Sequence, residues 1–340
     1  MRVLFAGSPA IAAPALLEIA ARHEIVGVLT NPESAQGRGK EILPTAVEAA
    51  ARAKLGAGLP ILKPERLDAA ARAAIAALAP DILVAFAYGK IFGPKFLALF
   101  PRGGINVHPS LLPRHRGSSP IQQAILDRDA ETGVSVQALA LEMDAGGLYA
   151  VERFPLSGGE TAAALSDRCA LIGARLAAAV LDDIESGRAS PRPQVGTPTY
   201  CRKIAKEDGL IDWTEPAAAI GAKIRAFNPW PQAYSFLDGR RLNLLEAAPL
   251  GATAAACAVA QAPAAVASGE ASGEASGQAL PNPPPGTIIG MDKALGIVVA
   301  TGEGCLALRK LQFAAKKALA YKEFANGLRG LAGMRFSKEP

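Results

Sequence analysis

The chain has 340 residues, of which 50% are apolar and 20% are charged, a composition typical of a folded globular protein and not of a disordered one. Its formal net charge of +5 permits a polyanionic partner without requiring one. The cysteines form no CxxC pair and give no zinc signature. No run of large apolar residues is long enough to span a bilayer, so we expect a cytoplasmic protein that does not enter a membrane.

Short apolar runs alternate with helical patterns in the first half of the chain. The first run, 3–6, ends at Gly7, too early for the apolar centre of a signal peptide, so it is better explained as a buried strand followed by a turn and a helix. The same pattern predicts strands over 25–30, 81–87 and 104–107, with helices over 44–54 and 65–78. This alternation indicates an α/β fold with a doubly wound, mostly parallel, Rossmann-like sheet, whose ligands collect at the carboxyl ends of the strands.

The second half of the chain has a different character. Two apolar runs, 134–141 and 148–154, could pair as a hairpin-like extension, and a long helix is expected over about 161–186. Beyond it, short β-like runs separated by Gly and Pro predict a small OB-like β-barrel. We therefore expect a first domain over 1–187, a linker over 188–206 and a second domain over 207–335, which carries a low-complexity insertion at 251–285.

Polar residues that could do chemistry are concentrated in 104–125. Asn106 and His108 are two residues apart, so at the end of an extended strand their side chains point the same way. An amide donor beside an imidazole can stabilise the oxyanion of a tetrahedral intermediate, and His108 is the best general acid available. The pair alone is nonetheless more often structural than catalytic.

A second such segment, 133–150, places Asp144 in a Gly-rich turn between two apolar runs. Turn chemistry alone explains an Asp before Ala-Gly-Gly. A catalytic interpretation requires the carboxylate to lie beside His108, where it would orient the imidazole and accept charge as an amine loses its proton.

The segment NVHPSLLPRHRGSSPIQ together with EMDAGG resembles the folate-dependent formyltransferases. The start MRVLFAGSP and the segments NPESAQGRGK, IRAFNPWPQAY and LQFAAKKA are similar to the branch of that family that acts on methionyl-tRNA. The resemblance covers nearly the whole chain apart from 251–285. One departure is His115, which stands where the family commonly has Trp.

The resemblance implies a catalytic set of Asn106, His108 and Asp144 in a formyltransferase domain over 1–187. The formyl donor would be 10-formyltetrahydrofolate, a cosubstrate, and no metal ion is expected. The acceptor would be the amino group of initiator methionyl-tRNA, and the enzyme would act as a monomer. The cleft for the folate would include Phe86, Tyr88, Gly89, Ser110, Leu111, Leu112 and Pro113.

The resemblance also implies two surfaces for the tRNA. The loop 31–43 would enter the acceptor stem, with Arg38 and Lys40 as its cations. The region from Cys305 to the end of the chain is rich in Lys and Arg, which suits a phosphate backbone, although a charge run is usually only a solvated surface. The cations expected to contact tRNA there are Arg309, Lys310, Lys316 and Lys317.

Other functions remain open from the sequence. A relative with the same chemistry could act on glycinamide ribonucleotide or an amino sugar nucleotide, and a non-catalytic RNA-binding protein could have kept the fold. The linker and the basic second domain argue against the first acceptor, and LQFAAKKA argues against the second. A Rossmann dehydrogenase is disfavoured because the turn after the first strand lacks the spaced glycines of a dinucleotide site.

Overall fold

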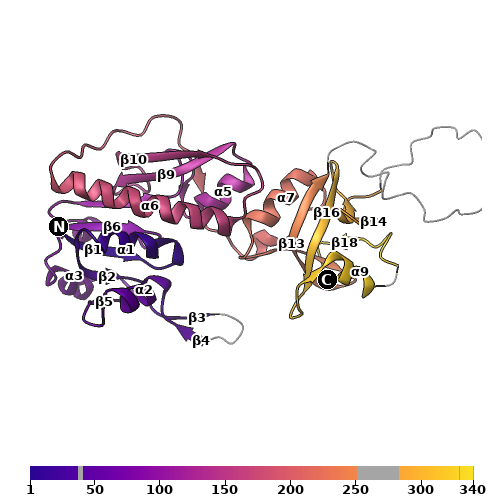
Figure 1. The fold of residues 1–340 in the computed structure, drawn as a ribbon, viewed down its shortest axis with the longest axis horizontal. Helices are drawn as coiled ribbons and strands as arrows, with labels where there is room; N and C mark the ends of the chain where they lie inside the picture. Colours follow the sequence, from indigo (N-terminus) through magenta and orange to yellow (C-terminus); the bar gives the residue numbers. More distant parts are fainter. Residues whose placement is uncertain (37–40, 251–282, 329, 340) are drawn as a thin grey trace, which may run out of the picture. The chain divides into compact units, whose positions relative to one another are not determined.

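The computed structural model of the protein describes residues 1–36, 41–250, 283–328 and 330–339 (Figure 1). The chain divides into two compact units, unit 1 over Met1–Lys203 and unit 2 over Ile204–Pro340. Unit 1 contains the segments in which the sequence predicts catalytic chemistry, and unit 2 contains the basic segment near the end of the chain.

Unit 1 is built on a seven-stranded sheet in which most strands are parallel, as the sequence predicts. The five parallel strands lie next to one another, and two antiparallel strands extend the sheet at one edge. In spatial order the strands are β10 (Leu148–Pro155), β9 (Glu131–Ala138), β7 (Gly104–His108), β6 (Ile82–Phe86), β1 (Arg2–Gly7), β2 (Glu24–Leu29) and β5 (Ile61–Leu62). The antiparallel pair β9–β10 is the hairpin-like extension expected from the two apolar runs.

Helices cover both faces of this sheet (Figure 1). Several begin at residues whose side chains accept a hydrogen bond from the backbone of the first turn, and Thr45, Asp68 and Thr161 act as such caps. The elements are η1 (Ala10–Ala12), α1 (Ala13–Ala20), α2 (Ala46–Lys54), α3 (Ala69–Ala76), α4 (Pro94–Leu97), α5 (Pro120–Leu126) and α6 (Ala162–Glu185).

The two faces of the sheet differ in what they bury. On one face, Leu4 of β1 packs in a cluster with Ile75 of α3 and Phe96 of α4. On the other face, a Cβ atom at Gly173 of α6 would lie 2.8 Å from Val107 of β7, so α6 approaches that strand closely. Because side chains alternate along a strand, the neighbours of Val107 in β7 point away from α6. The polar residues of β7 therefore lie on the face opposite α6.

Two short pairs of strands complete unit 1. The strand β8 (Arg116–Gly117) pairs with β11 (Tyr200–Cys201), so the end of unit 1 returns to the segment that follows β7. The strands β3 (Ser34–Gln36) and β4 (Glu41–Leu43) form an antiparallel pair. The sequence predicts a loop over 31–43, so this pair of strands was not expected.

Unit 2 is an antiparallel sheet that curls on itself, in agreement with the OB-like barrel expected from the sequence. An isolated bridge between Thr287 and Arg335 joins the chain just before the two edge strands, β14 and β18. The strands are β12 (Ala233–Leu237), β13 (Arg240–Leu250), β14 (Ile288–Asp292), β15 (Gly296–Ala300), β16 (Cys305–Phe313), β17 (Leu319–Ala320) and β18 (Phe336–Ser337). They are accompanied by η2 (Glu207–Gly209), α7 (Ala217–Ala226) and α9 (Tyr321–Asn326).

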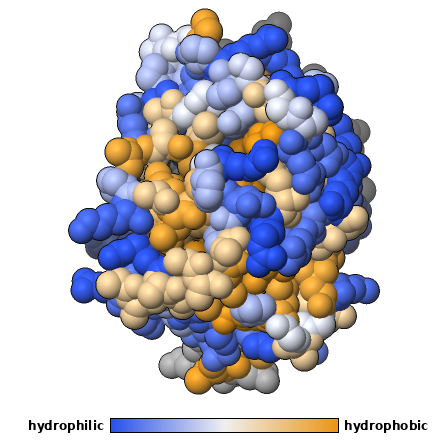
Figure 2. Space-filling model, turned by 90° about the vertical axis from the view of Figure 1, so that its left-hand side faces the viewer, coloured by the Kyte–Doolittle hydropathy of each residue, from blue (hydrophilic) through white to orange (hydrophobic). Residues whose placement is uncertain are grey.

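Figure 2 shows one face of the molecule, on which hydrophilic residues interrupt the apolar areas. Within the described parts of the chain, no helix is long and apolar enough to cross a membrane.

The apolar interior of unit 2 generates a stability prediction. Leu308 is fully buried in the cluster that contains Trp213, and the second tryptophan, Trp230, also belongs to unit 2. Tryptophan fluorescence during urea unfolding therefore reports on this unit. We expect Leu308→Ala to lower the free energy of unfolding by about 2–5 kcal/mol because it leaves a cavity.

The matched control is Met291→Ala, which truncates a side chain that is 44% exposed in the same sheet. A change within about 0.5 kcal/mol is expected for it. Equal shifts for the two variants would contradict the assignment of Leu308 to the core.

Candidate active site

The polar side chains at the end of β7 meet the turn that follows β9. Asn106 Nδ2 donates a hydrogen bond to Asp144 Oδ1 at 3.3 Å, and His108 Nδ1 lies 3.6 Å from the same oxygen. The structure thus brings together the three residues that the sequence analysis predicted as a catalytic set, although 38 residues separate Asn106 from Asp144.

The carboxylate of Asp144 is surrounded by hydrogen-bond donors. Gln137 Nε2 donates to Oδ1 at 2.9 Å, and the backbone N–H of Gly117 donates to Oδ2 at 2.8 Å. Asp144 itself has a φ of 53°, a left-handed conformation that Asp adopts more readily than most residues. The turn therefore directs the carboxylate inward, where these donors satisfy its two oxygens.

The imidazole of His108 is held in one tautomer. Its Nε2 atom lies 2.9 Å from the backbone carbonyl of His115, and a carbonyl can only accept, so Nε2 carries the hydrogen. Burial lowers the pKa of His108 below its ordinary value, while Asp144 and the carbonyl of His115 act in the opposite direction. The side chain is consequently a neutral imidazole whose Nδ1 lone pair faces Asp144.

Three residues that the sequence analysis missed support Asp144. Gln137 is a polar residue in the apolar run of β9, and that interruption is the only sequence signal for it. Gln194 Nε2 donates to the backbone carbonyls of Asp144 at 2.8 Å and Gly146 at 2.9 Å. Its Oε1 accepts from Arg116 Nη2 at 2.8 Å. Gln194 lies in the predicted linker, where the composition suggested only a spacer.

The residues predicted to form the folate cleft fall into different environments. Leu111, Leu112 and Pro113 line a groove of about 1060 Å³, together with residues of β10 and of the segment 188–197. Ser110 is fully buried, and its hydroxyl donates to the carbonyl of Arg114 at 2.6 Å. Leu111, Leu112 and Pro113 belong to the wall of the groove, whereas Ser110 shapes the turn behind it.

The remaining predicted cleft residues lie at the end of β6 and directly after it. Phe86 is fully buried and contacts α6 at Gly173. Tyr88 stacks on Phe92 with the ring centroids 5.6 Å apart, and burial raises the pKa of its hydroxyl to about 12. Among the described residues, that hydroxyl has no hydrogen-bond partner. Gly89 has a φ of 82°, a conformation that favours glycine.

The cations predicted to contact tRNA are only partly described. Arg38 and Lys40 lie outside the described residues. In unit 2, Arg309, Lys310, Lys316 and Lys317 are all exposed. Lys310 lies 3.4 Å from Glu246, and in the described part of the chain no ion pair involves Lys316 or Lys317.

Comparison with known proteins identifies the family. Residues 1–181 match the formyl transferase family, and residues 203–329 match the C-terminal domain of formyl transferases. The chain is 44% identical over 333 residues to a methionyl-tRNA formyltransferase of Treponema pallidum, with 96% of each chain covered. It is 38% identical over 339 residues to that of a Roseiflexus species, covering 98% of this chain and 95% of the relative. The chain belongs to the methionyl-tRNA formyltransferase family.

Solved structures agree with this assignment at the level of the fold. HypX from Aquifex aeolicus, determined in complex with tetrahydrofolic acid, superposes with a TM-score of 0.58 at 17% identity. The match covers 97% of this chain and 48% of HypX. At that identity it supports the two-part architecture of the methionyl-tRNA formyltransferase family and nothing finer.

The buried histidines of this family member generate a pH prediction. His23 and His108 both have pKa values lowered by burial, so on acidification the unfolded chain takes up their protons before the folded chain does. Stability rises with pH wherever the unfolded state binds more protons. The stability that comes from burying the two histidines as neutral rings is therefore fully present above about pH 6.5 and is lost progressively below it.

We therefore expect the free energy of unfolding to fall as the pH is lowered from about 7.5 to 5.5. Because the chain has only three histidines, NMR titration of ¹⁵N-histidine-labelled protein can resolve them. The prediction is wrong if His108 titrates above its ordinary value.

Proposed function

We propose that this protein transfers a formyl group from 10-formyltetrahydrofolate to the free amino group of methionyl initiator tRNA, the modification that prepares this tRNA for translation initiation. The observation that carries the proposal is that Asn106 and His108 both lie against one carboxylate oxygen of Asp144. Its support from the family is the 44% identity to a methionyl-tRNA formyltransferase along nearly the whole chain.

The chemistry needs a direct attack of a neutral amine on the formyl carbon. A bond forms between the amine nitrogen and the formyl carbon, and the bond between that carbon and N10 of the folate breaks. The amine loses one proton and N10 gains one, so the reaction is balanced without a covalent enzyme intermediate or a metal ion.

Each of the three side chains has a role in this reaction. Asn106 Nδ2 donates a hydrogen bond to the oxyanion that develops on the formyl oxygen. Nδ1 of His108, with its lone pair, takes up a proton and then helps to stabilise the same oxygen. Asp144 offsets the positive charge that appears on the imidazole when Nδ1 takes up the proton that the amine loses.

The residues around Asp144 suit a folate. Leu141 and Met143, in the same turn, are 65% and 59% exposed, and such apolar side chains favour contact with a flat aromatic ring. Leu111, Leu112 and Pro113 supply apolar surface to the groove described above, whose lining does not include Asn106, His108 or Asp144. We propose that these residues hold the donor, with Tyr88 and Gly89 shaping the other side of the cleft and Phe86 supporting it from the core.

The tRNA is proposed to contact both units. Arg38 and Lys40 belong to the segment proposed to enter the acceptor stem. Arg309, Lys310, Lys316 and Lys317 offer exposed positive charge to the phosphate backbone. Arg240 extends this charge because its guanidinium lies 3.9 Å from the ring centroid of Phe313, close in sequence to Lys316. We propose that the enzyme acts as a monomer in the cytoplasm.

The decisive assay offers three acceptors to the protein with 10-formyltetrahydrofolate: initiator methionyl-tRNA, elongator methionyl-tRNA and an amino sugar nucleotide. We expect transfer to the initiator alone. Transfer to the sugar amine would retain the catalytic site and overturn the acceptor. Absence of transfer to all three would favour a non-catalytic RNA-binding protein.

Substitution of the catalytic set tests the mechanism. Asn106→Ala, His108→Ala and Asp144→Asn are each expected to lower kcat about 10²–10³-fold, the usual effect of removing a group that stabilises a developing oxyanion. The matched control is His23→Asn, which alters a buried histidine beside Asp182 and Glu185. Near-normal turnover in any of the three variants would remove that residue from the mechanism.

Charge reversal tests the tRNA surface. Lys316→Glu with Lys317→Glu is expected to raise KM for the tRNA about 10-fold, to leave kcat within about 2-fold, and to flatten the dependence of KM on salt. Lys54→Glu with Lys95→Glu, which changes the net charge by the same amount at exposed cations of α2 and α4, is the control. Equal effects of the two changes would indicate a response to net charge and would contradict a local contact.

A further inference from the structure

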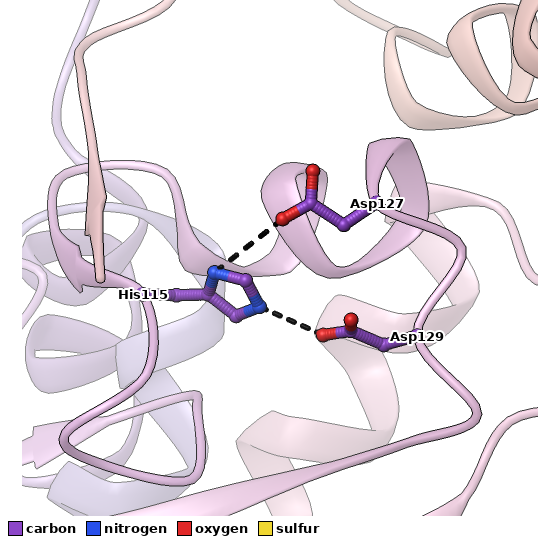
Figure 3. A group of neighbouring side chains, drawn as sticks. All are labelled: His115, Asp127 and Asp129. Carbon is purple, nitrogen blue, oxygen red and sulfur yellow. Dashed lines mark hydrogen bonds and ion pairs between the residues drawn. The ribbon is translucent and has the colours of Figure 1, made fainter. Parts of the chain in front are cut away.

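A histidine outside the predicted catalytic set lies between two carboxylates directly beside the site. His115 is buried, with 3% of its surface exposed. Its Nε2 atom lies 2.7 Å from Asp129 Oδ2, and its Nδ1 atom lies 3.9 Å from Asp127 Oδ2 (Figure 3). Both acids follow α5, so this contact ties the loop after β7 to the end of that helix.

The arrangement suits a held imidazole better than a bound metal ion, although the three side chains have suitable ligand atoms. Figure 3 shows that each carboxylate faces a different nitrogen of the ring. The two carboxylates and a single ring nitrogen therefore do not point at a common position that one metal ion could occupy. Arg114 also lies 2.5 Å from Asp129 Oδ1, and its positive charge disfavours a cation there.

The backbone of the short segment 115–117 contacts both ionisable members of the catalytic set. The carbonyl of His115 accepts from His108 Nε2 at 2.9 Å. Two residues later, the N–H of Gly117 donates to Asp144 Oδ2 at 2.8 Å. The direction of two peptide groups in this segment therefore decides how the imidazole and the carboxylate face each other.

The conformation of this segment depends on contacts with other parts of the chain. His115 has a φ of 55°, in the left-handed region that is strained for a residue other than glycine. Its backbone N–H is held by Thr199 Oγ1 at 2.8 Å, and its side chain is held by Asp129. Without the side-chain contact, the strain favours rotation of the peptide that presents the carbonyl to His108.

We propose that His115 is a positioning residue for the formyl transfer: the hydrogen-bond contact of its ring with Asp129 fixes the strained turn whose carbonyl orients His108. This inference rests on the proposed function, because it assigns His108 a role in that reaction. His115 itself touches no reacting atom; it acts through its backbone on the catalytic imidazole.

The test compares His115→Asn and Asp129→Asn with the wild type. Asn tolerates the left-handed conformation and loses the contact with Asp129, whereas Asp129→Asn keeps the histidine and weakens the contact from the other side. We expect each variant to lower kcat about 10–100-fold, since a small misplacement of a catalytic group has effects of that size, and to change KM less than about 2-fold. The double variant is expected to be no slower than the slower single variant.

A spectroscopic measurement on the same proteins does not depend on activity. Long-range ¹H–¹⁵N spectra of ¹⁵N-histidine-labelled protein show which ring nitrogen of His108 carries the hydrogen and whether it is hydrogen-bonded. We expect a single Nε2–H tautomer in the wild type and a mixture in both variants. His23→Asn is the matched control, because it alters another buried histidine beside acidic side chains.

Each outcome decides the inference. Folded variants with wild-type kcat and an unchanged His108 spectrum overturn it. Equal losses in His115→Asn and His23→Asn also overturn it, because they indicate general destabilisation. If the wild type transfers no formyl group, the proposed function fails, while the spectra still decide whether the ring of His115 orients His108.

Discussion

A partly buried carboxylate, that of Asp144, is the group on which the rest of the site depends. Its side chain is 12% exposed, and an ionised group in such a place is costly unless hydrogen bonds replace its water. Those hydrogen bonds come from Asn106 of β7, Gln137 of β9 and the backbone of Gly117 in β8. Since the donors belong to different strands, the stability of this one charge fixes the positions of those strands relative to the turn that carries it.

The register between β7 and β9 follows from this requirement. The two strands are antiparallel, and Asn106 lies directly opposite Gln137, so both amides point to the same face and reach the same oxygen. A slip of one residue would turn one of them toward α6. Because the pairing is antiparallel, β9 ends beside the start of β7, where Ala138 lies opposite Ile105, and the turn that follows β9 folds back so that the carboxylate of Asp144 reaches Asn106.

The sequence predicted the parts of this arrangement that depend on local geometry. Period-two alternation placed Asn106 and His108 on one face of a strand, and apolar runs located the strands of the sheet. Asp144 joined them only through resemblance, because no local pattern measures the distance between residues so far apart in the chain. Gln194 was missed for the same reason. Its segment has the composition of a spacer, yet its amide holds the backbone of the Asp144 turn.

Contacts made by the backbone explain why sequence patterns see only part of such a site. The carbonyl that orients His108 and the N–H that binds Asp144 are supplied by peptide groups, which every residue possesses. The requirement at these positions is therefore on the backbone conformation and not directly on side-chain identity. At Gly117 this requirement is visible, because a Cβ atom would lie 2.2 Å from the carbonyl oxygen of Cys201. At His115 it is hidden, since many side chains could hold the same turn if they found a partner as His115 finds Asp129.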